Sequence, residues 1–298
     1  MTDQEWLKAL RSVFGPNDPA IKSLEQLVAT AQHDQMLNLA YYFGTDLQAR
    51  ATSDDLAAVE AVLKQLSAEA TTDAQRAVLS ALLDNAPNTT NADLAKLNSR
   101  LNIAQTGLML AGSLSVLKQE IYQRLMHLEG KTQQGYNTQL KRKALIKTAL
   151  KTGQADDDLP MIFKHMQGLA IDLDKVIDYQ VQTHMNPHAL EKAANEALKV
   201  EDWKAQTAKS YQRAQAAAKR IFLTEAKATQ TREVAHRYRA NGYEKVKVVS
   251  RHNEHVCDFC TGMDGTQTAL TKLVIGVNAP PFHPNCQCNI IPVRGDYT

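Results

Sequence analysis

The segments "HVCDFCTGMDGTQTAL", residues 255–270, and "NAPPFHPNCQCNIIPV", residues 278–293, hold every cysteine of the 298-residue chain. A C-x-x-C pair lets one tight turn aim two sulfurs at a single metal ion. A second group of ligands beyond a loop is a common layout of structural zinc sites. The pattern therefore predicts a zinc ion with five candidate ligands, namely Cys257, Cys260, His283, Cys286 and Cys288.

Five candidates compete for the four positions of a tetrahedral zinc site. Either all four cysteines bind and His283 lies behind them, or His283 binds and one of Cys286 and Cys288 is left over. Because a catalytic zinc keeps one position open for water, the surplus of ligands favours a structural role. The alternative is that the cysteines are merely buried or form disulfides. The charged start "MTDQEWLKAL" has no apolar core typical of a signal peptide, so we expect a cytoplasmic protein, in which disulfides are disfavoured.

The cysteines lie in a region whose pattern differs from that of the preceding chain. Residues 244–251, "EKVKVVSR", alternate as in a strand, and "NIIPV" at 289–293 is a second strand candidate. Between them, Asp264-Gly265 is a hairpin-turn signal. A long helix is predicted from Trp203 to about Ala240, and Gly242 provides its stop.

Helix formers dominate the remainder of the chain. Over all 298 residues, 44% are hydrophobic and 22% are charged. Proline, glycine and polar breaks at 14–20, 85–91 and 150–160 separate the helical stretches. We expect Ser53 to cap one helix, and Asn186 to cap another. The predicted fold class is mainly α, with a helical N-terminal body and a small α+β C-terminal zinc-binding module. The predicted domains are residues 1–90, 91–200 and 201–298.

One charge-free run, residues 101–117, has the composition of either a membrane span or a buried helix. It is short for a span and carries Asn, Gln, Thr and Ser, so a buried helix of a bundle is the prediction. No contact with a membrane is expected.

Positive charge is concentrated between residues 201 and 251, where twelve Lys or Arg face five Asp or Glu. This predicts a basic face that contacts DNA phosphates without reading the base sequence. The candidate residues are Arg232, Arg237, Arg239, Lys245 and Lys247. The alternative is an ordinary solvated helix face.

From about Arg220 to Val293 the chain resembles the phage minor head protein family, which is phage Mu protein F-like and acts in head morphogenesis. The matching elements, in family order, are Thr224-Glu225, Tyr238 to Gly242, "KVVSR", "VCDFC", "MDG" and "APPFHPNCQC". Leu223 and Gln287 depart from it, because the family usually has arginine at both places. The reading of residues 1–200 rests on helical pattern alone.

The resemblance implies a minor capsid component of the virion, located inside the head near the portal and present in the host cytoplasm during assembly. Its implied partners are the portal protein and the capsid or scaffold proteins, and its implied roles are head assembly and handling of packaged DNA. No enzymatic activity is expected.

The competing interpretation is a metal-dependent nuclease, or a phage-carried toxin or effector that uses the zinc module. His236, His252, Asn253 and His255 lie close to the cysteines in sequence. A nuclease needs a histidine base and a divalent ion at the phosphate. No phosphate-binding glycine loop and no nucleophile motif accompanies these residues.

Overall fold

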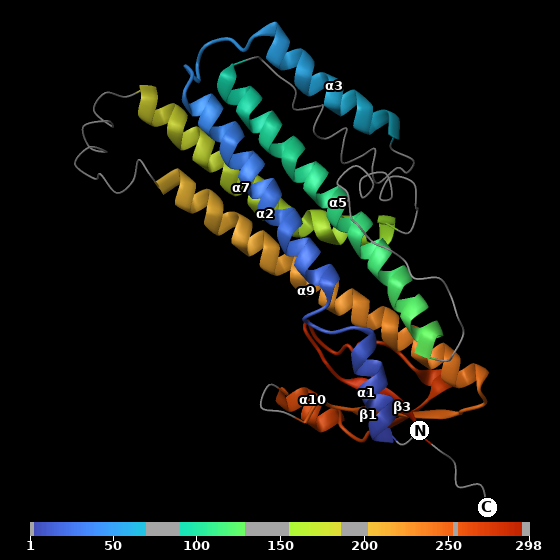
Figure 1. Ribbon diagram of the computed structural model, residues 1–298. Helices are drawn as coiled ribbons and strands as arrows, with labels where there is room; N and C mark the ends of the chain where they lie inside the picture. Colours follow the sequence, from blue (N-terminus) through green and yellow to red (C-terminus); the bar gives the residue numbers. More distant parts are fainter. Residues whose placement is uncertain (1–2, 70–89, 129–154, 186–201, 253–255, 294–298) are drawn as a thin grey trace, which may run out of the picture. The chain divides into compact units, whose positions relative to one another are not determined.

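The computed structural model describes residues 3–69, 90–128, 155–185, 202–252 and 256–293 (Figure 1). Within these residues the protein is mostly helical, with one small antiparallel sheet near the C-terminus. The predicted fold class is confirmed. The helices are α1 (Asp3–Val13), α2 (Pro19–Phe43), α3 (Ser53–Glu69), α5 (Asn91–Leu128), α7 (Ala155–Met185), α9 (Asp202–Ala240) and α10 (Asp258–Met263). The strands are β1 (Lys245–Val249), β2 (Gln267–Ala269) and β3 (Asn289–Pro292), and a 3-10 turn, η1 (Leu270–Lys272), follows β2.

The chain divides into two compact units. Unit 1 comprises Met1–Lys22, Val116–Gln139 and Lys219–Thr298, and unit 2 comprises Ser23–Ser115 and Leu140–Ala218. The domain boundaries expected near residues 90 and 200 adjoin or fall within ranges outside the described residues, so they stay predictions.

Unit 2 contains an antiparallel bundle built around α5. On one side, Asn98 and Ser99 of α5 bond Tyr42 and Gln35 of α2. On another side, α5 and α7 run antiparallel, because Lys96 pairs with Asp178 and Arg100, further along α5, pairs with the earlier Asp174 of α7. Successive helices α2, α5, α7 and α9 alternate in direction, and each buries its apolar face against a neighbour.

Polar contacts also join α9 to this bundle. The buried Tyr211 hydroxyl donates to the Asn102 side chain of α5 at 2.8 Å. Trp203 packs edge-on against Phe43 of α2, with 5.0 Å between ring centroids. The first part of α9 is therefore a full member of the bundle, although its sequence is largely polar.

Two threonines cap helices of unit 2. Thr90 precedes α5 and exchanges hydrogen bonds with Asp93, an arrangement that satisfies free N–H groups in the first turn. Thr52 accepts a hydrogen bond from the N–H of Asp55. The cap of α3 is therefore Thr52, one residue before the predicted Ser53, because the side chain that reaches the third helical N–H is the one placed just outside the helix. The predicted cap at Asn186 lies outside the described residues.

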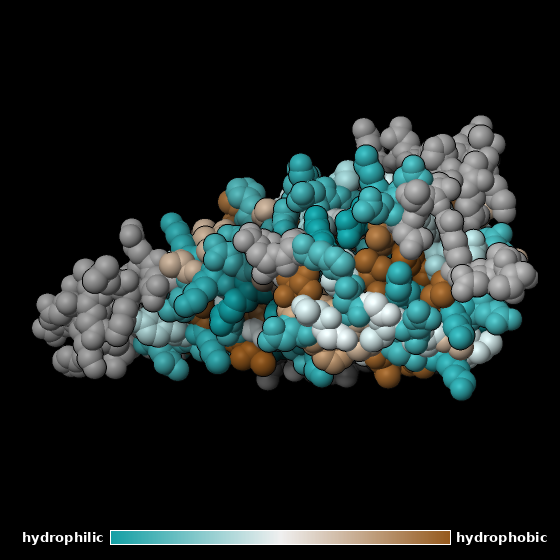
Figure 2. All heavy atoms as spheres, turned by 90° about the horizontal axis from the view of Figure 1, so that it is seen from below, coloured by the Kyte–Doolittle hydropathy of each residue, from teal (hydrophilic) through white to brown (hydrophobic). Residues whose placement is uncertain are grey.

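The charge-free run 101–117 lies inside α5 and most of its side chains are buried, as expected for a bundle helix. Within the described parts of the chain, no helix combines the length and apolarity that crossing a membrane requires. Hydrophilic side chains cover much of the surface seen in Figure 2, and hydrophobic side chains occupy small patches between them.

Unit 1 contains the sheet, whose order is β2-β1-β3. Val248 of β1 pairs with Ile290 of β3, and both are buried, so one face of the sheet forms a core. Helix α1 contacts β3, and Trp6 of α1 packs against Tyr238 of α9. Residues from both ends of the chain thus build the same small core.

The predicted turn at Asp264-Gly265 is present but does not connect a β-hairpin. It follows α10 and precedes β2, and Thr266 donates to the carbonyl of Met263 at 3.1 Å. The φ of Gly265 is 75°, a conformation that glycine adopts without a steric penalty. Helix α10 therefore lies between β1 and β2, a position that the turn signal alone does not predict.

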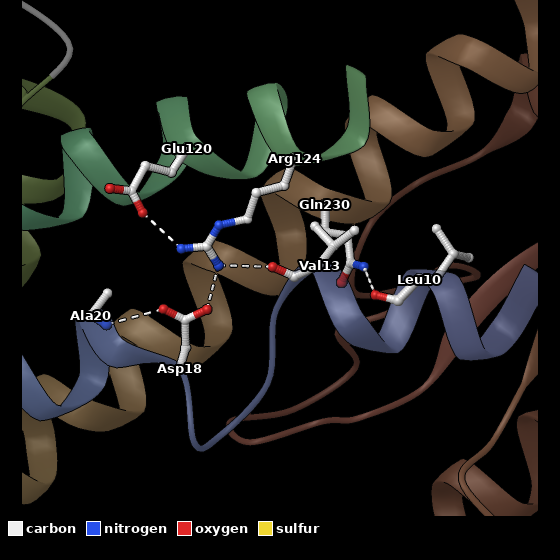
Figure 3. Close-up of polar contacts among 7 residues, drawn as sticks. All are labelled: Leu10, Val13, Asp18, Ala20, Glu120, Arg124 and Gln230. Atoms are coloured by element: carbon white, nitrogen blue, oxygen red, sulfur yellow. Dashed lines mark hydrogen bonds and ion pairs between the residues drawn. The ribbon is translucent and has the colours of Figure 1, made fainter. Parts of the chain in front are cut away.

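Arg124, near the end of α5, connects three segments of unit 1 (Figure 3). Its guanidinium contacts Asp18, donates to the carbonyl oxygen of Val13 at 2.9 Å and pairs with Glu120 at 2.7 Å. Asp18 in turn accepts from the N–H of Ala20 at the start of α2. The arginine thereby holds the bend between α1 and α2.

Candidate metal centre

Helix α10 positions the first pair of sulfurs. Cys257 is its N-cap residue, and its Sγ accepts from the N–H of Cys260 at 3.5 Å. Because Cys260 lies in the first turn, both sulfurs face the same side. Cys257 is exposed, whereas Cys260 is buried.

A tight turn before β3 positions the second group. The N–H of Cys286 donates to the carbonyl of His283 at 3.1 Å, and Asn285 between them has a φ of 66°. Asparagine is one of the few residues that tolerate this left-handed conformation. Cys288 follows immediately before β3, so the sheet holds it in place.

The five predicted side chains lie together around Cys260. Cys257, Cys260 and His283 form one group, and Cys260, Cys286 and Cys288 form another, with the ligand atoms in each group within 4.8 Å of one another. Either group could hold a metal ion. No disulfide joins these cysteines, which are all free.

The sulfur-to-sulfur separation matches that expected around a zinc ion, whereas the two nitrogen-to-sulfur separations are shorter, so the imidazole would move outward by a few tenths of an ångström on binding. Bond lengths of about 2.3 Å to sulfur and about 2.0 Å to nitrogen place tetrahedral ligand atoms about 3.5–3.8 Å apart. The sulfurs of Cys260 and Cys286 are 3.7 Å apart, and His283 Nε2 lies 3.2 Å from the sulfur of Cys257 and 3.0 Å from that of Cys260. The residues present therefore fit a metal ion of this size and softness.

The orientation of His283 suits a metal ligand. Its Nδ1 lies 2.8 Å from the carbonyl oxygen of Pro284. Because a carbonyl can only accept, Nδ1 carries the proton and the lone pair of Nε2 points toward the sulfurs of Cys257 and Cys260. Metal-binding histidines typically donate their other ring N–H in this way.

The local environment divides the thiols into two kinds. A backbone hydrogen bond from Cys260 lowers the pKa of Cys257, and a hydrogen bond from the Cys288 thiol lowers the pKa of Cys286 to about 5. Burial raises the pKa of Cys260 to about 12, and the bond to Cys286 raises that of Cys288. Burial opposes the charged form of His283, but the Pro284 carbonyl and nearby thiolates raise its pKa overall.

A small surface pocket opens onto these ligands, and its lining includes Arg251 and Gln287 besides four of the five candidates. Arg251 donates to the side-chain oxygen of Gln287, the residue that replaces the family's arginine. Nothing in the sequence around either residue predicts this hydrogen bond.

The histidines of the nuclease interpretation are not brought to the metal ligands within the described residues. His252 pairs with Asp264 at 2.9 Å and does not line the pocket. His236 is exposed on α9, while Asn253 and His255 lie outside the described residues.

The predicted basic residues differ in their contacts. Arg232 and Lys245 are exposed, Lys247 is half-buried, and Arg239 donates to the carbonyl of Leu270. Arg237 lies over the ring of Tyr122, 5.5 Å from its centroid. Part of this positive charge therefore serves the fold of unit 1.

The comparison with known families covers this whole region. The family model described as "Phage Mu protein F like protein" matches residues 129–291, more than half of the chain. The chain belongs to this family. The resemblance seen in the C-terminal motifs is thereby confirmed. The match extends upstream of Arg220 to residue 129, through a stretch in which helical pattern alone had carried the prediction. No curated protein and no solved structure was found to match.

Membership of this Mu F-like family makes the chain a phage head morphogenesis protein, expected in the virion in association with other head proteins. Such a family is structural, which agrees with the predicted absence of enzymatic activity without testing it. All five candidate metal ligands lie within the matched region, which ends at residue 291 in β3.

Proposed function

We propose that this Mu F-like protein is a minor capsid component that sits inside the phage head near the portal, assists head assembly and contacts packaged DNA. In this proposal it has no enzymatic role, and its zinc ion is structural. The observation that carries it is the family match over residues 129–291, which ends in a module with a ready metal site.

The location can be tested in heads assembled in cells from the capsid, scaffold and portal proteins of the same phage. We expect the full-length protein to sediment with heads that contain the portal and to resist added protease until the heads are opened. An unrelated soluble protein of similar size is the control for passive trapping. Equal incorporation into heads that lack the portal would contradict the portal association.

We propose that the metal is zinc and that its ligands come from Cys257, Cys260, His283, Cys286 and Cys288. Support comes from the crowding of soft ligands at tetrahedral spacing and from the tautomer of His283. Such a site would hold α10, the turn before β3 and the sheet in one arrangement, and metal-binding energy would become folding energy.

Elemental analysis of protein purified without added metal should give about one zinc per chain. The double change Cys257→Ser and Cys260→Ser should abolish the zinc, while Thr261→Ser, in the same helix, should retain it. Single changes Cys286→Ser and Cys288→Ser then separate the two ligand sets, since only one of them should release the metal if His283 binds, and both should if all four cysteines bind. Full zinc retention in the double variant would sink the proposal.

We propose DNA binding through the exposed members of the basic set. Phosphate contacts release counterions, so about three to five contacts should give a log–log salt slope of about −3 to −5. The variant Arg232→Gln with Lys245→Gln should flatten the slope by about two units, because both side chains are exposed. Lys64→Gln, at an exposed lysine of α3, is the matched control. Absence of salt-sensitive binding by the native protein would contradict a DNA role.

A further inference from the structure

Lys227 of α9 is buried, and its ammonium group points into unit 1. It donates to the side-chain oxygen of Asn289 at 2.6 Å and to that of Gln230 at 3.0 Å. Both partners are neutral amides, and among the described residues no carboxylate is paired with Lys227. A buried ammonium without an opposite charge is costly, so Lys227 either loses its proton or is stabilised by negative charge nearby.

The cysteines of the candidate metal centre lie close to this lysine. Asn289, the partner of Lys227, directly follows Cys288 in the chain. Burial lowers the pKa of Lys227 to about 8, while the charges of Cys286 and Cys288 act in the opposite direction and favour the ammonium. The nearby guanidinium of Arg11 repels it, so negative charge on these two cysteines, which metal binding requires, would be its attractive partner.

Charge balance relates this lysine to the ligand set. A zinc ion with three thiolates and a neutral imidazole carries a net charge of about −1, and one with four thiolates about −2, because each cysteine binds as the thiolate. The tautomer of His283 favours the imidazole as a ligand. One ammonium neutralises a three-thiolate centre.

We propose that Lys227 is the built-in counter-cation of a metal centre made of three cysteine thiolates and His283, and that its charge strengthens metal binding. This inference rests on the proposed zinc site. Lys227 does not touch the metal; it acts through the charge that α9 places beside the second cysteine group. Helix and metal module are thereby linked electrostatically as well as through the Asn289 hydrogen bond.

Two neutral replacements separate the charge from the hydrogen bond. Lys227→Met removes both, and Lys227→Gln keeps a donor that can serve Asn289. The dissociation constant for zinc, measured by competition with a chromophoric chelator, should rise about 10- to 100-fold in both variants, the usual effect of altering groups behind the ligands. Lys272→Met removes the same charge from an exposed position of η1 and should leave zinc affinity unchanged.

Substitution by Co²⁺ provides an independent measurement. The charge-transfer absorption of the native protein should correspond to three thiolates, and both Lys227 variants should reach the same intensity at saturation, because the ligands remain. Metal-free Lys227→Met should unfold no more easily than the metal-free native protein, since a buried charge has been removed.

The outcomes are distinguishable. If the native protein binds no zinc, the proposed metal site fails and this inference falls with it. If the native protein binds zinc but both Lys227 variants bind it equally well, only the counter-cation role is overturned. Weakening in Lys227→Met but not in Lys227→Gln would assign the effect to the hydrogen bond and also overturn it. An absorption of four thiolates would refute the ligand set.

Discussion

Replacing Arg124 with methionine should destabilise unit 1 by about 2–3 kcal/mol. The side chain of Asp18 is only 5% exposed and that of Glu120 is 12% exposed, so both carboxylates depend on the guanidinium for compensation. Removing one partner of a buried ion pair costs about 3–5 kcal/mol. Arg124 is itself 33% exposed, so water reaches the carboxylates left behind and reduces the cost to about 2 kcal/mol. The lost bond to the Val13 carbonyl contributes about 1 kcal/mol more.

The two tryptophans of the chain allow this cost to be measured in the right unit. Trp6 packs against Tyr238 in unit 1, and Trp203 packs against Phe43 in unit 2. In a Trp203→Phe background, fluorescence during denaturant unfolding reports on unit 1 through Trp6 alone. The Arg124→Met change should lower the midpoint of this transition. In a Trp6→Phe background the shift seen by Trp203 should be smaller.

The matched control is Asp18→Asn, which keeps an acceptor for the N–H of Ala20 but removes the charge. In an Asp18→Asn chain, Arg124→Met should cost about 1 kcal/mol less than in the native chain, since no carboxylate at this position is left uncompensated. Two results would refute the reasoning. One is a cost of less than about 0.5 kcal/mol for Arg124→Met, and the other is a cost that is the same, to within about 0.5 kcal/mol, in the native and Asp18→Asn chains.

Two further predictions concern Gly107 in unit 2 and Asp264 in unit 1. A Cβ atom at Gly107 of α5 would lie 2.8 Å from the ring of Phe163. Gly107→Ala should change the stability of unit 2 by less than about 1 kcal/mol, because alanine's better helix propensity offsets the cost of displacing the ring. Gly107→Leu should cost about 1–3 kcal/mol. An unchanged unfolding midpoint of Gly107→Leu, measured by Trp203 fluorescence, would argue against this packing. Burial acts against the charged form of Asp264, but the N–H of Ser250 and the His252 side chain lower its pKa overall. A lowered pKa contributes stability that is present above about pH 4 and lost as the pH falls below it. The urea midpoint should therefore fall less between about pH 5 and 3 in Asp264→Asn than in the native protein. An equal fall in both proteins would contradict this role of Asp264.

Local sequence determined much of the C-terminal module. The bounds of α9, the strand at 245–249 and the strand after Cys288 all follow patterns that lie within a few residues of each element. The metal candidates were equally accessible, because a C-x-x-C turn and the turn from His283 to Cys286 each bring two ligands together through neighbouring backbone atoms. The sequence by itself also predicted the buried helix at 101–117 from its lack of charge.

The choices between local alternatives needed tertiary structure. Thr52 and Ser53 are both good capping residues, and only the path of the backbone entering α3 decides which side chain reaches the free N–H. The Asp264-Gly265 turn is compatible with several connections, and the packing of α10 placed it after a helix.

Contacts between distant parts of the chain were decided by the fold alone. Nothing in the pattern of α1 indicates that it covers β3, which lies near the other end of the chain. Nor does any motif indicate that Arg124 reaches back 106 residues to Asp18. Lys227 is the clearest case. In sequence it is one of many basic residues on a polar helix, and only the packing of α9 against β3 removes it from water and sets its charge beside the cysteines. Local interactions fix which residues can act as ligands, whereas burial, which depends on the whole fold, decides which charges those ligands must balance.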